Sequence, residues 1–406
     1  MTSALDTTCC IVGGGPAGMM LGVLLARAGV RTVVLEKHSD FLRDFRGDTI
    51  HPSTLELMHE LGVLNEFLEL PHYKAYHVYG QFGTMRFRVA DFTRLPTRCG
   101  FIVFMPQWEF LDFLAHQGRQ YSAFELRMET EVTGLLEEDC RICGVRASSP
   151  AGNLEIRTDL VIGADGRSST ARAHSALEVE EFDAPMDVLW FRLSKRIGDP
   201  ADPIGHFAAG RILVMISRST HWQFGYVIPK GATSDLRARG IEAFRAAVAE
   251  LAVFAADRVQ EIASWDDVKL LTVAVDRLRR WHRPGLLCIG DAAHAMSPIG
   301  GVGINLAIQD AVACANQIAR PLREGALTDA DLASVQKRRF FPTRITQRVQ
   351  ITVQDTVMRR LLVRDVSRPL RPPLAVRAIS RLPALQRITA RIVGVGVRPE
   401  HIAPAG

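Results

Sequence analysis

The sequence lacks several features that would place the protein in other classes. No apolar run among its 406 residues reaches the roughly 18 residues that a helix needs to cross a bilayer. No basic stretch precedes the first apolar run, so we expect no signal peptide. The chain has no internal repeat and no low-complexity segment. These absences favour a cytoplasmic, globular protein.

Cysteine is scarce, with seven in the whole chain. A low, odd number argues against a disulfide framework and indicates a thiol-reduced protein. Cys140 and Cys143 have the spacing of a metal-binding or redox pair, but no second Cys or His pair accompanies them. We therefore predict no metal site.

The net charge of +5 is distributed unevenly, because residues 336–406 carry +12 and residues 1–335 about −7. Such a basic segment could contact a membrane surface or a nucleic acid. Solvated helix faces, paired with the acidic body of the protein, explain the same charge more simply. We therefore expect no nucleic-acid partner and no membrane contact, while assembly into an oligomer stays open.

Residues 11–36 organise the rest of the chain. Gly13, Gly15 and Gly18 form G-x-G-x-x-G between a short apolar strand and a helical run that begins at Pro16-Ala17. These glycines permit a tight turn, the approach of a pyrophosphate to the backbone, and close packing of the helix on the strand. The helix N-terminus would then face the phosphates with free N–H groups and the positive end of its dipole.

A carboxylate ends the second predicted strand. Glu36, followed by Lys37, lies eighteen residues after Gly18. A carboxylate there can accept hydrogen bonds from both ribose hydroxyls and would repel a 2′-phosphate. The sequence therefore predicts a site for FAD or NAD and excludes NADP from this motif.

Two further glycine and acid turns follow buried strands far along the chain, at Asp165-Gly166 and at Gly290-Asp291. A plain dehydrogenase keeps its dinucleotide site in one contiguous unit. Extra turns from distant segments make sense when the cofactor is long and extended, as FAD is. We therefore predict an α/β fold in which a β-rich insertion interrupts the nucleotide-binding domain.

Three motifs together resemble the class A FAD-dependent aromatic hydroxylases, the para-hydroxybenzoate hydroxylase-like flavin monooxygenases, over about residues 7–345. The first motif is the glycine turn with Glu36. The second is Gly163-Ala164-Asp165-Gly166 with Ser168 and Arg172. The third is Gly290-Asp291-Ala292-Ala293-His294 with Pro298, Gly301, Gly303 and Asn305.

The resemblance implies a Rossmann-like FAD domain of the glutathione-reductase type, with an inserted β-sheet substrate domain and a C-terminal helical segment. We expect the FAD domain to be discontinuous. The predicted limits are 1–75, 100–180 and 270–335 for the FAD domain, 76–99 and 181–269 for the substrate domain, and 336–406 for the helical, basic segment.

The resemblance also assigns the cofactor contacts. They are Gly13, Gly15, Pro16, Ala17, Gly18, Glu36, Lys37, Arg46, Gln107, Val132, Asp165, Asp291, Pro298, Gly301, Gly303, Ile304 and Asn305. Within this set Val132 corresponds to a backbone contact with adenine, Gln107 to a contact near the ribityl or phosphate region, and Asp291 to the ribityl hydroxyls. Residues 301–305 would set backbone N–H groups against the flavin pyrimidine, where a helix N-terminus favours the negative charge of reduced flavin.

The implied function is an FAD-dependent monooxygenase. It would use NAD(P)H and O₂ to hydroxylate an aromatic or polyketide-like small molecule through a flavin C4a-hydroperoxide, in a site that excludes water. The chain has no second G-x-G-x-x-G, so the nicotinamide cofactor would have no Rossmann domain of its own, and the choice between NADH and NADPH stays open.

No catalytic residue is singled out by the sequence. His51 and Arg46 are the candidates, because His51 should lie near the substrate face of the flavin and Arg46 near the path of the nicotinamide cofactor. His294 is expected to pack within its turn. Candidates for the substrate wall are Trp190, Arg192, Met215 and Tyr226, on predicted strands whose register is open.

Three alternatives are weighed against this prediction. Residues 224–229 echo part of a flavin-dependent halogenase signature. A flavoprotein that retains FAD for a non-oxygenating role, as a cyclase or a binding protein, would share the same motifs. The basic segment would also suit a membrane-associated hydroxylase of the ubiquinone type.

Overall fold

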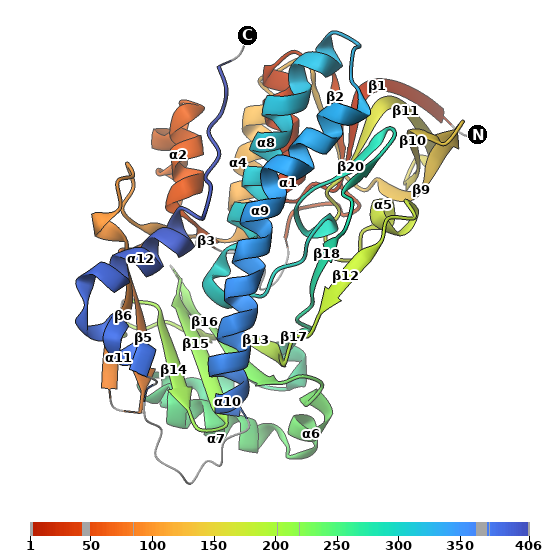
Figure 1. Ribbon diagram of the computed structural model, residues 1–406. Helices are drawn as coiled ribbons and strands as arrows, with labels where there is room; N and C mark the ends of the chain where they lie inside the picture. Colours follow the sequence, from red (N-terminus) through yellow and green to blue (C-terminus); the bar gives the residue numbers. More distant parts are fainter. Residues whose placement is uncertain are drawn as a thin grey trace.

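A computed structural model describes residues 3–42, 49–83, 85–200, 202–218, 220–362, 372 and 374–404 (Figure 1). Within these residues two large β-sheets form the framework, and helices cover them. No helix of this part of the chain combines the length and apolar character that a membrane crossing requires.

The first sheet has eight strands in the described part of the chain, in the order β19-β20-β11-β1-β2-β8, with β9 and β10 continuing from β11. Strands β20, β11, β1, β2 and β8 run parallel. Their bounds are β1 Ser3–Val12, β2 Thr32–Leu35, β8 Phe124–Arg127, β9 Glu131–Glu138, β10 Arg141–Ser149, β11 Gly152–Gly163, β19 His282–Arg283 and β20 Leu286–Cys288.

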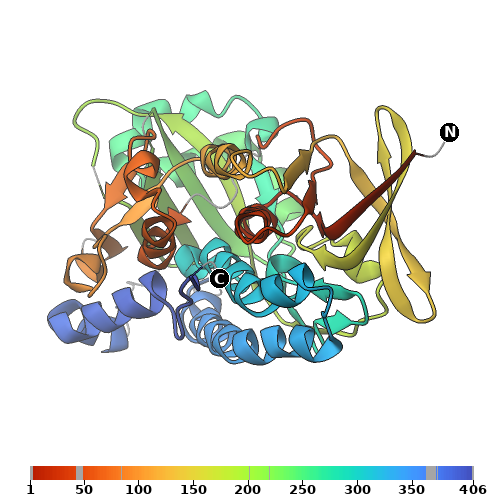
Figure 2. The same ribbon diagram turned by 90° about the horizontal axis from the view of Figure 1, so that it is seen from above.

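Alternate residues of the parallel strands point to opposite faces of this sheet. Ile11 and Ile162 pack under three helices, α1 (Pro16–Arg27), α4 (Gln107–Gly118) and α8 (Gly303–Arg323). Cys10 and Val161 pack on the other face, against β9, β10 and the short α5 (Thr170–Ala173). Figure 2 shows the yellow strands β9–β11 at one end of the molecule, beside the first residues of β1.

The second sheet has seven strands among the described residues, in the order β17-β13-β16-β15-β14-β5-β6. One face packs on α7 (Ile241–Leu251) and the 3₁₀ segment η2 (Val253–Glu261). The strand bounds are β5 His77–Phe82, β6 Met85–Asp91, β13 Met186–Ser194, β14 Ile204–Ala208, β15 Arg211–Ser217, β16 His221–Pro229 and β17 Lys269–Leu271.

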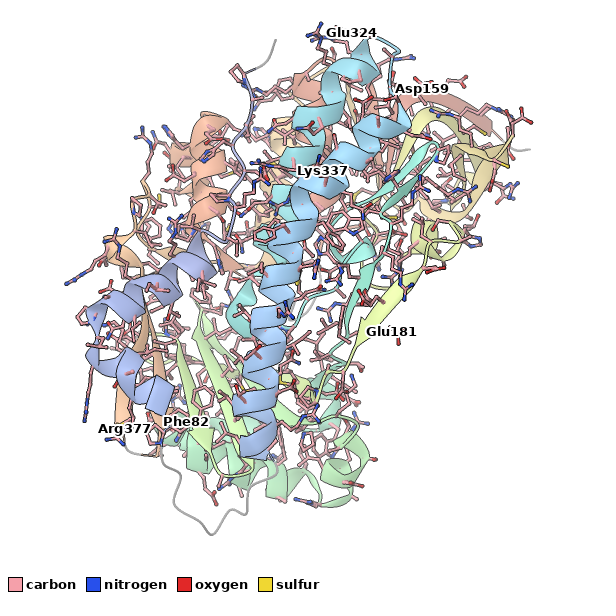
Figure 3. All side chains as sticks on the ribbon, viewed as in Figure 1. Phe82, Asp159, Glu181, Glu324, Lys337 and Arg377 are labelled. Carbon is pink, nitrogen blue, oxygen red and sulfur yellow. The ribbon has the colours of Figure 1, made fainter. Side chains whose placement is uncertain are left out.

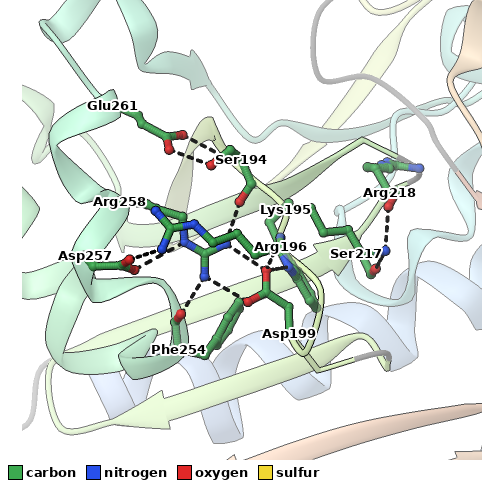
Figure 4. A network of polar contacts seen from close by, with 11 residues as sticks. Ser194, Lys195, Arg196, Asp199, Ser217, Arg218, Phe254, Asp257, Arg258 and Glu261 are labelled. Atoms are coloured by element: carbon green, nitrogen blue, oxygen red, sulfur yellow. Dashed lines mark hydrogen bonds and ion pairs between the residues drawn. The ribbon is translucent and has the colours of Figure 1, made fainter.

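A buried ion pair fastens η2 to this sheet (Figure 4). Nη1 of Arg258, whose side chain is 1% exposed, lies 2.7 Å from Oδ2 of Asp199. The same Arg258 nitrogen donates to the Ser194 carbonyl, and the Trp222 indole N–H donates to Asp199. Hydrogen bonds from Arg258 lower the pKa of Asp199 to about 2. The pair therefore stays ionised at neutral pH and holds the turn after β13 in place.

Smaller elements join the two sheets. β3 and β4 pair with β7 in a three-stranded sheet, and β12 pairs with β18. Their bounds are β3 Thr49–Ile50, β4 Tyr73–Ala75, β7 Ile102–Phe104, β12 Val179–Phe182 and β18 Val275–Leu278, with α2 Pro52–Glu60, α3 Leu64–Phe67, α6 Thr233–Ala238, η1 Phe92–Arg94, η3 Trp265–Asp267, η4 Gly290–Ala292 and η5 Ile299–Gly301.

The C-terminal helices span both sheets. α9 (Asp329–Val353) extends from the first sheet toward the second and continues through a π-helical turn, η6 (Gln354–Met358), into α10 (Arg359–Leu362) (Figure 1). α11 (Leu374–Arg381) and α12 (Pro383–Gly394) lie beside β6 and η1. Side chains fill the space beneath α9; Lys337, labelled in Figure 3, is exposed, whereas Arg339 is fully buried.

Candidate functional site

The glycine turn of the first motif is closely packed at one residue and open at another. A Cβ on Gly13, whose φ is +104°, would lie 2.6 Å from the carbonyl oxygen of Ala164. A Cβ on Gly15 would meet only that same oxygen, at 4.0 Å. Gly15 is the N-cap of α1, Pro16 follows, and no side chain of the described residues caps this helix. The turn therefore leaves space and free N–H groups where an anion can approach.

Glu36 lies directly against this turn. Its Oε2 accepts a hydrogen bond from the Gly14 N–H at 3.1 Å, and its Oε1 accepts one from the His38 N–H. The Thr130 N–H donates to the Glu36 carbonyl, which sets the start of β9, with Val132, beside Glu36. Glu36 and Val132 therefore lie at one end of the motif, while the Lys37 side chain is exposed to solvent.

Backbone hydrogen bonds join the three motifs at the carboxyl ends of neighbouring parallel strands. The Gly13 N–H donates to Leu35, the Ala164 N–H donates to Val12, and the Ile289 N–H donates to Gly163. A Cβ on Gly290 would lie 3.2 Å from the Cβ of Ala17 and 3.1 Å from that of Ala307. Segments almost 300 residues apart thus share one edge of the sheet, where open α/β sheets bind their ligands.

Asp165 of the second motif and Asp291 of the third differ in how many hydrogen bonds their carboxylate oxygens already accept from the protein. Asp165 accepts hydrogen bonds from the Ser169 hydroxyl at 2.5 Å and the Ala171 N–H at 3.1 Å, so it organises the turn into α5. Burial raises the pKa of Asp165, against these hydrogen bonds. Asp291 is half-buried, and its Oδ2 accepts from Arg167 Nε at 3.2 Å. Its Oδ1 has no hydrogen bond from the described residues and can accept one from a ligand hydroxyl.

The loop before α8 presents backbone N–H groups. Pro298 precedes η5, in which Gly300 and Gly301 have φ of +80° and +62°. A Cβ on Gly301 would lie 2.7 Å from Oγ1 of Thr49, whereas one on Gly303 would meet nothing closer than 3.8 Å. Among the described residues no side chain caps α8 and its first turn holds no acid, so its N-terminus, including Ile304, can face a negatively charged group.

Asn305 joins this loop to the segment before α2. Its Oδ1 accepts from the His51 N–H at 2.8 Å and from the Thr54 hydroxyl at 2.7 Å, and its Nδ2 donates to the Thr49 carbonyl at 3.0 Å. The side chain of Asn305 is therefore occupied by the protein, and only its backbone is available to a cofactor. Gln107 opens α4 and is half-buried, and its side chain makes no hydrogen bond to the described residues.

His51 is an internal link in this arrangement. Its ring is fully buried, and Nδ1 lies 2.7 Å from the carbonyl oxygen of Val393 in α12. Burial lowers its pKa to about 4, so the ring is neutral at pH 7. The other catalytic candidate, Arg46, lies outside the described residues.

The family of the chain follows from its relatives. A family model described as an FAD binding domain matches residues 6–349. The 6-methylpretetramide 4-monooxygenase of Streptomyces rimosus is 37% identical over 401 residues, or 95% of this chain and 92% of that enzyme. The chain belongs to the FAD-dependent monooxygenases. The predicted resemblance to class A aromatic hydroxylases is thereby confirmed.

Other relatives of this FAD-dependent monooxygenase agree. The 12-dehydrotetracycline 5-monooxygenase/anhydrotetracycline 6-monooxygenase of Streptomyces rimosus is 30% identical over 317 residues, or 74% of this chain and 60% of that enzyme. A solved p-nitrophenol 4-monooxygenase from Pseudomonas putida has a TM-score of 0.77 at 18% identity, covering 97% of this chain and 96% of that one. The predicted fold class is confirmed, and neither the halogenase nor the cyclase alternative is favoured.

The residues of the monooxygenase fit FAD. Gly15 and Gly303 leave open space where a Cβ would project, whereas Gly13 and Gly301 are tightly enclosed. The first pair therefore suits a ligand that approaches the backbone, and the second pair serves the packing of the chain. The open oxygen of Asp291 lies at the same sheet edge. Which of the predicted residues touch FAD stays a prediction, as do the domain limits.

The four predicted substrate residues of the monooxygenase divide between the two faces of the second sheet. Met215 and Tyr226 are 3% and 5% exposed and pack toward α7, where the Tyr226 ring lies 5.4 Å from that of Phe244. Trp190 and Arg192 point to the other face, which meets β7 and α12. Met215 and Tyr226 therefore belong to a hydrophobic core, which corrects their assignment to the substrate wall.

The sequence analysis missed the group that holds the third motif. Asp310 is fully buried in α8 and accepts from the Gly290 N–H at 3.2 Å, from His294 Nε2 at 2.5 Å and from Arg339 Nε at 2.8 Å. Burial alone would raise the pKa of Asp310, but His294 and Arg339 outweigh it and lower the pKa. His294 thus packs within its turn, as expected. A signal was present, because Gln309-Asp310 interrupts an otherwise apolar helical run.

Proposed function

We propose that this monooxygenase hydroxylates a polycyclic aromatic polyketide, with NADH or NADPH as the reductant and O₂ as the second substrate. The observation that carries the proposal is the likeness to a 6-methylpretetramide 4-monooxygenase along almost the whole chain. At the sheet edge described above, bound FAD would supply the redox chemistry, in which electrons from the nicotinamide cofactor activate O₂.

The residues of the chain would do the rest. Gly15 and the N-terminus of α1 would bind the pyrophosphate, and Glu36 the adenosine ribose. The α8 N-terminus would stabilise the negative charge of the reduced pyrimidine by about 0.5–2 kcal/mol. The sheet face with Trp190 would exclude water from the reacting ring.

The experiment is a turnover assay of the purified, yellow protein. NADH and NADPH oxidation would be followed with phenols and with hydroxylated tricyclic and tetracyclic aromatics, under ¹⁸O₂. We expect polycyclic phenols to stimulate NAD(P)H oxidation. The product should be 18 mass units heavier than the substrate, because one ¹⁸O atom is inserted as the new hydroxyl oxygen. A protein that purifies without FAD, or that produces only peroxide with every ring system, would refute the proposal.

We further propose that the enzyme acts in the cytoplasm, without a nucleic-acid or membrane partner. All seven cysteines are free thiols, which supports a reducing compartment. In the basic segment Arg338 and Arg339 pair with Glu400, and Arg359 pairs with Asp183 and Asp355. Sedimentation with anionic vesicles at low salt tests this proposal, and binding to them would contradict it.

A further inference from the structure

Three glutamines lie on one face of α9 and its continuation. Gln347, Gln350 and Gln354 are spaced by three and four residues and are 1%, 3% and 0% exposed. Nε2 of Gln347 donates to the carbonyls of Asp276 and Ala295. The first glutamine therefore holds the segment that follows the third motif.

Gln350 continues this pattern one turn nearer to residues 298–302, the loop before α8, which we call the flavin loop. Its Nε2 donates to the Ser297 carbonyl at 2.9 Å and to the Ile299 carbonyl at 2.8 Å. The end of α9 is therefore fixed to the backbone that leads into residues 299–303.

Gln354 is equally buried, but its side chain does not donate to a backbone carbonyl of the described residues. Both its Nε2 and its Oε1 are buried without a hydrogen-bond partner among the described residues. A buried amide that bonds to nothing is costly, and such a group in a native structure calls for a ligand or another explanation. Gln354 also begins the π-helical turn η6, and π-helical turns occur frequently at functional sites.

The neighbours of Gln354 show which way it faces. Ile351, Val357 and Met358, three or four residues away on the same side, pack against a cluster that contains Val188 of β13. Ile299 of the flavin loop also packs against this cluster. The residues one turn before and after Gln354 therefore pack on the same cluster as Ile299 and Val188.

A second unpaired group lies on that sheet face. Trp190 packs against the same cluster, and its Nε1 is buried without a partner in the described part of the chain. A Cβ on Gly225 would lie 3.0 Å from Cζ3 of Trp190, so the indole lies across the neighbouring strand and has little freedom to turn away. The indole with the unpaired donor and the helical turns around the unpaired amide thus pack on one and the same cluster.

We propose that Gln354 and Trp190 bind the polar edge of the aromatic substrate, a ring hydroxyl beside a ring carbonyl. Oε1 of Gln354 accepts from the hydroxyl, and Nε2 of Gln354 with Nε1 of Trp190 donates to the carbonyl oxygen. Both side chains are neutral, so a carboxylate edge would leave Oε1 unpaired. The inference rests on the proposed function, and it adds that α9 orients the substrate relative to the loop that Gln350 holds.

The test compares two ligands that differ only in their hydroxyls, 1,8-dihydroxy-9,10-anthraquinone and 9,10-anthraquinone. Their dissociation constants are measured by equilibrium dialysis with the FAD-loaded enzyme. Q354M keeps the volume and removes the amide. We expect Q354M to bind the dihydroxy ligand about tenfold more weakly and the parent quinone, which offers only its carbonyl to Nε2, about threefold more weakly. W190F keeps an aromatic ring and removes the donor to the carbonyl that both ligands carry, so it should weaken both ligands about three- to tenfold.

The matched control is Q117M. Gln117 is a similarly buried glutamine, but its Nε2 donates to both carboxylate oxygens of Glu66, far along α4. Q117M should lower the melting temperature and leave the preference between the two ligands unchanged. If Q354M fails to load FAD, W190F carries the test by itself.

Equal preference for the two ligands in the wild type, a preference that survives in Q354M, or an unchanged affinity for both ligands in W190F would overturn the inference. NAD(P)H oxidation and FAD content are measured in parallel. Wild-type enzyme that discriminates the ligands but never hydroxylates them would refute the proposed function while leaving the assignment of Gln354 and Trp190 in place.

Discussion

His51 should make the stability of the enzyme depend on pH in the weakly acidic range. Its ring is fully buried, and burial lowers its pKa from 6.5 to about 4, against the opposing effect of the Val393 carbonyl. The unfolded chain therefore binds a proton near pH 6.5 that the folded chain accepts only near pH 4. The stability that the neutral ring contributes is complete above pH 6.5 and is lost as the pH falls toward 4.

The magnitude follows from the two pKa values. Between pH 7 and pH 5 the linkage amounts to about 2 kcal/mol. H51N removes the titrating ring. The side-chain amide nitrogen of the asparagine takes about the position of Nδ1 of His51, so it can still donate to the Val393 carbonyl. Urea unfolding, followed by circular dichroism at both pH values, should show a loss about 2 kcal/mol smaller in H51N than in the wild type.

His221 supplies the control. Burial, with Arg218 and Arg192 nearby, lowers its pKa to about 4 as well, but its side chain is partly exposed and distant in sequence from α12. H221N should therefore reduce the acid sensitivity by less than H51N does. If wild type and H51N lose equal stability between pH 7 and pH 5, the account of His51 as a buried neutral link is refuted.

Three further substitutions test the sheet edge that joins the motifs. G13A would place a Cβ 2.6 Å from the Ala164 carbonyl at a φ of +104°. We expect the free energy of unfolding to fall by about 1–3 kcal/mol and the absorbance of bound flavin to decrease, whereas a normal flavin content would contradict the packing argument. D310N would leave buried Arg339 without its nearer charge partner, so we expect the free energy of unfolding, measured by chemical denaturation, to fall by about 3–5 kcal/mol. A loss below about 1 kcal/mol would refute this role of Asp310. E36Q should lower the affinity for FAD by tenfold or more in a fluorescence titration, because a charge-assisted hydrogen bond to the ribose becomes a neutral one. An unchanged affinity would show that Glu36 does not bind the ribose.

The three motifs could be placed from the sequence because each depends on local rules. A buried strand followed by glycine predicts a strand end, and parallel strands bring such ends to one edge. The close approach of Gly13 to Ala164 and of Gly290 to Ala17 follows from that arrangement. The sequence therefore predicted the first sheet and the edge that the three motifs share, although these segments are far apart in the chain.

The faces on which the substrate candidates lie could not be predicted in the same way, because parts of the second sheet are buried on both faces. Residues 186–189 of β13 are all buried, so hydrophobic alternation carries no information about which face meets α7. The faces become distinct only through tertiary packing. Met215 pairs in register with Phe224 and shares its face, whereas Trp190 pairs with Gly225 on the opposite side.

The C-terminal segment was also beyond the sequence analysis, and it shows why net charge is a poor guide to packing. Its surplus of arginines suggested solvated helix faces, yet Arg339 is fully buried between Asp310 and Glu400. Burying a guanidinium is tolerable only with such partners. One carboxylate comes from α8, and the other comes from beyond α12.

The chain after residue 349 also contacts residues near the third motif. The family match ends at residue 349, but the carbonyl of Val393 holds His51, and a Cβ on Gly394 would lie 3.1 Å from the ring of Phe92. Gln354 also lies beyond that limit. The part of the chain that the family model matches thus carries the three motifs, while the segment after it contacts His51 and Phe92. We therefore expect differences in substrate among relatives to depend on residues after 349 more than on the three motifs.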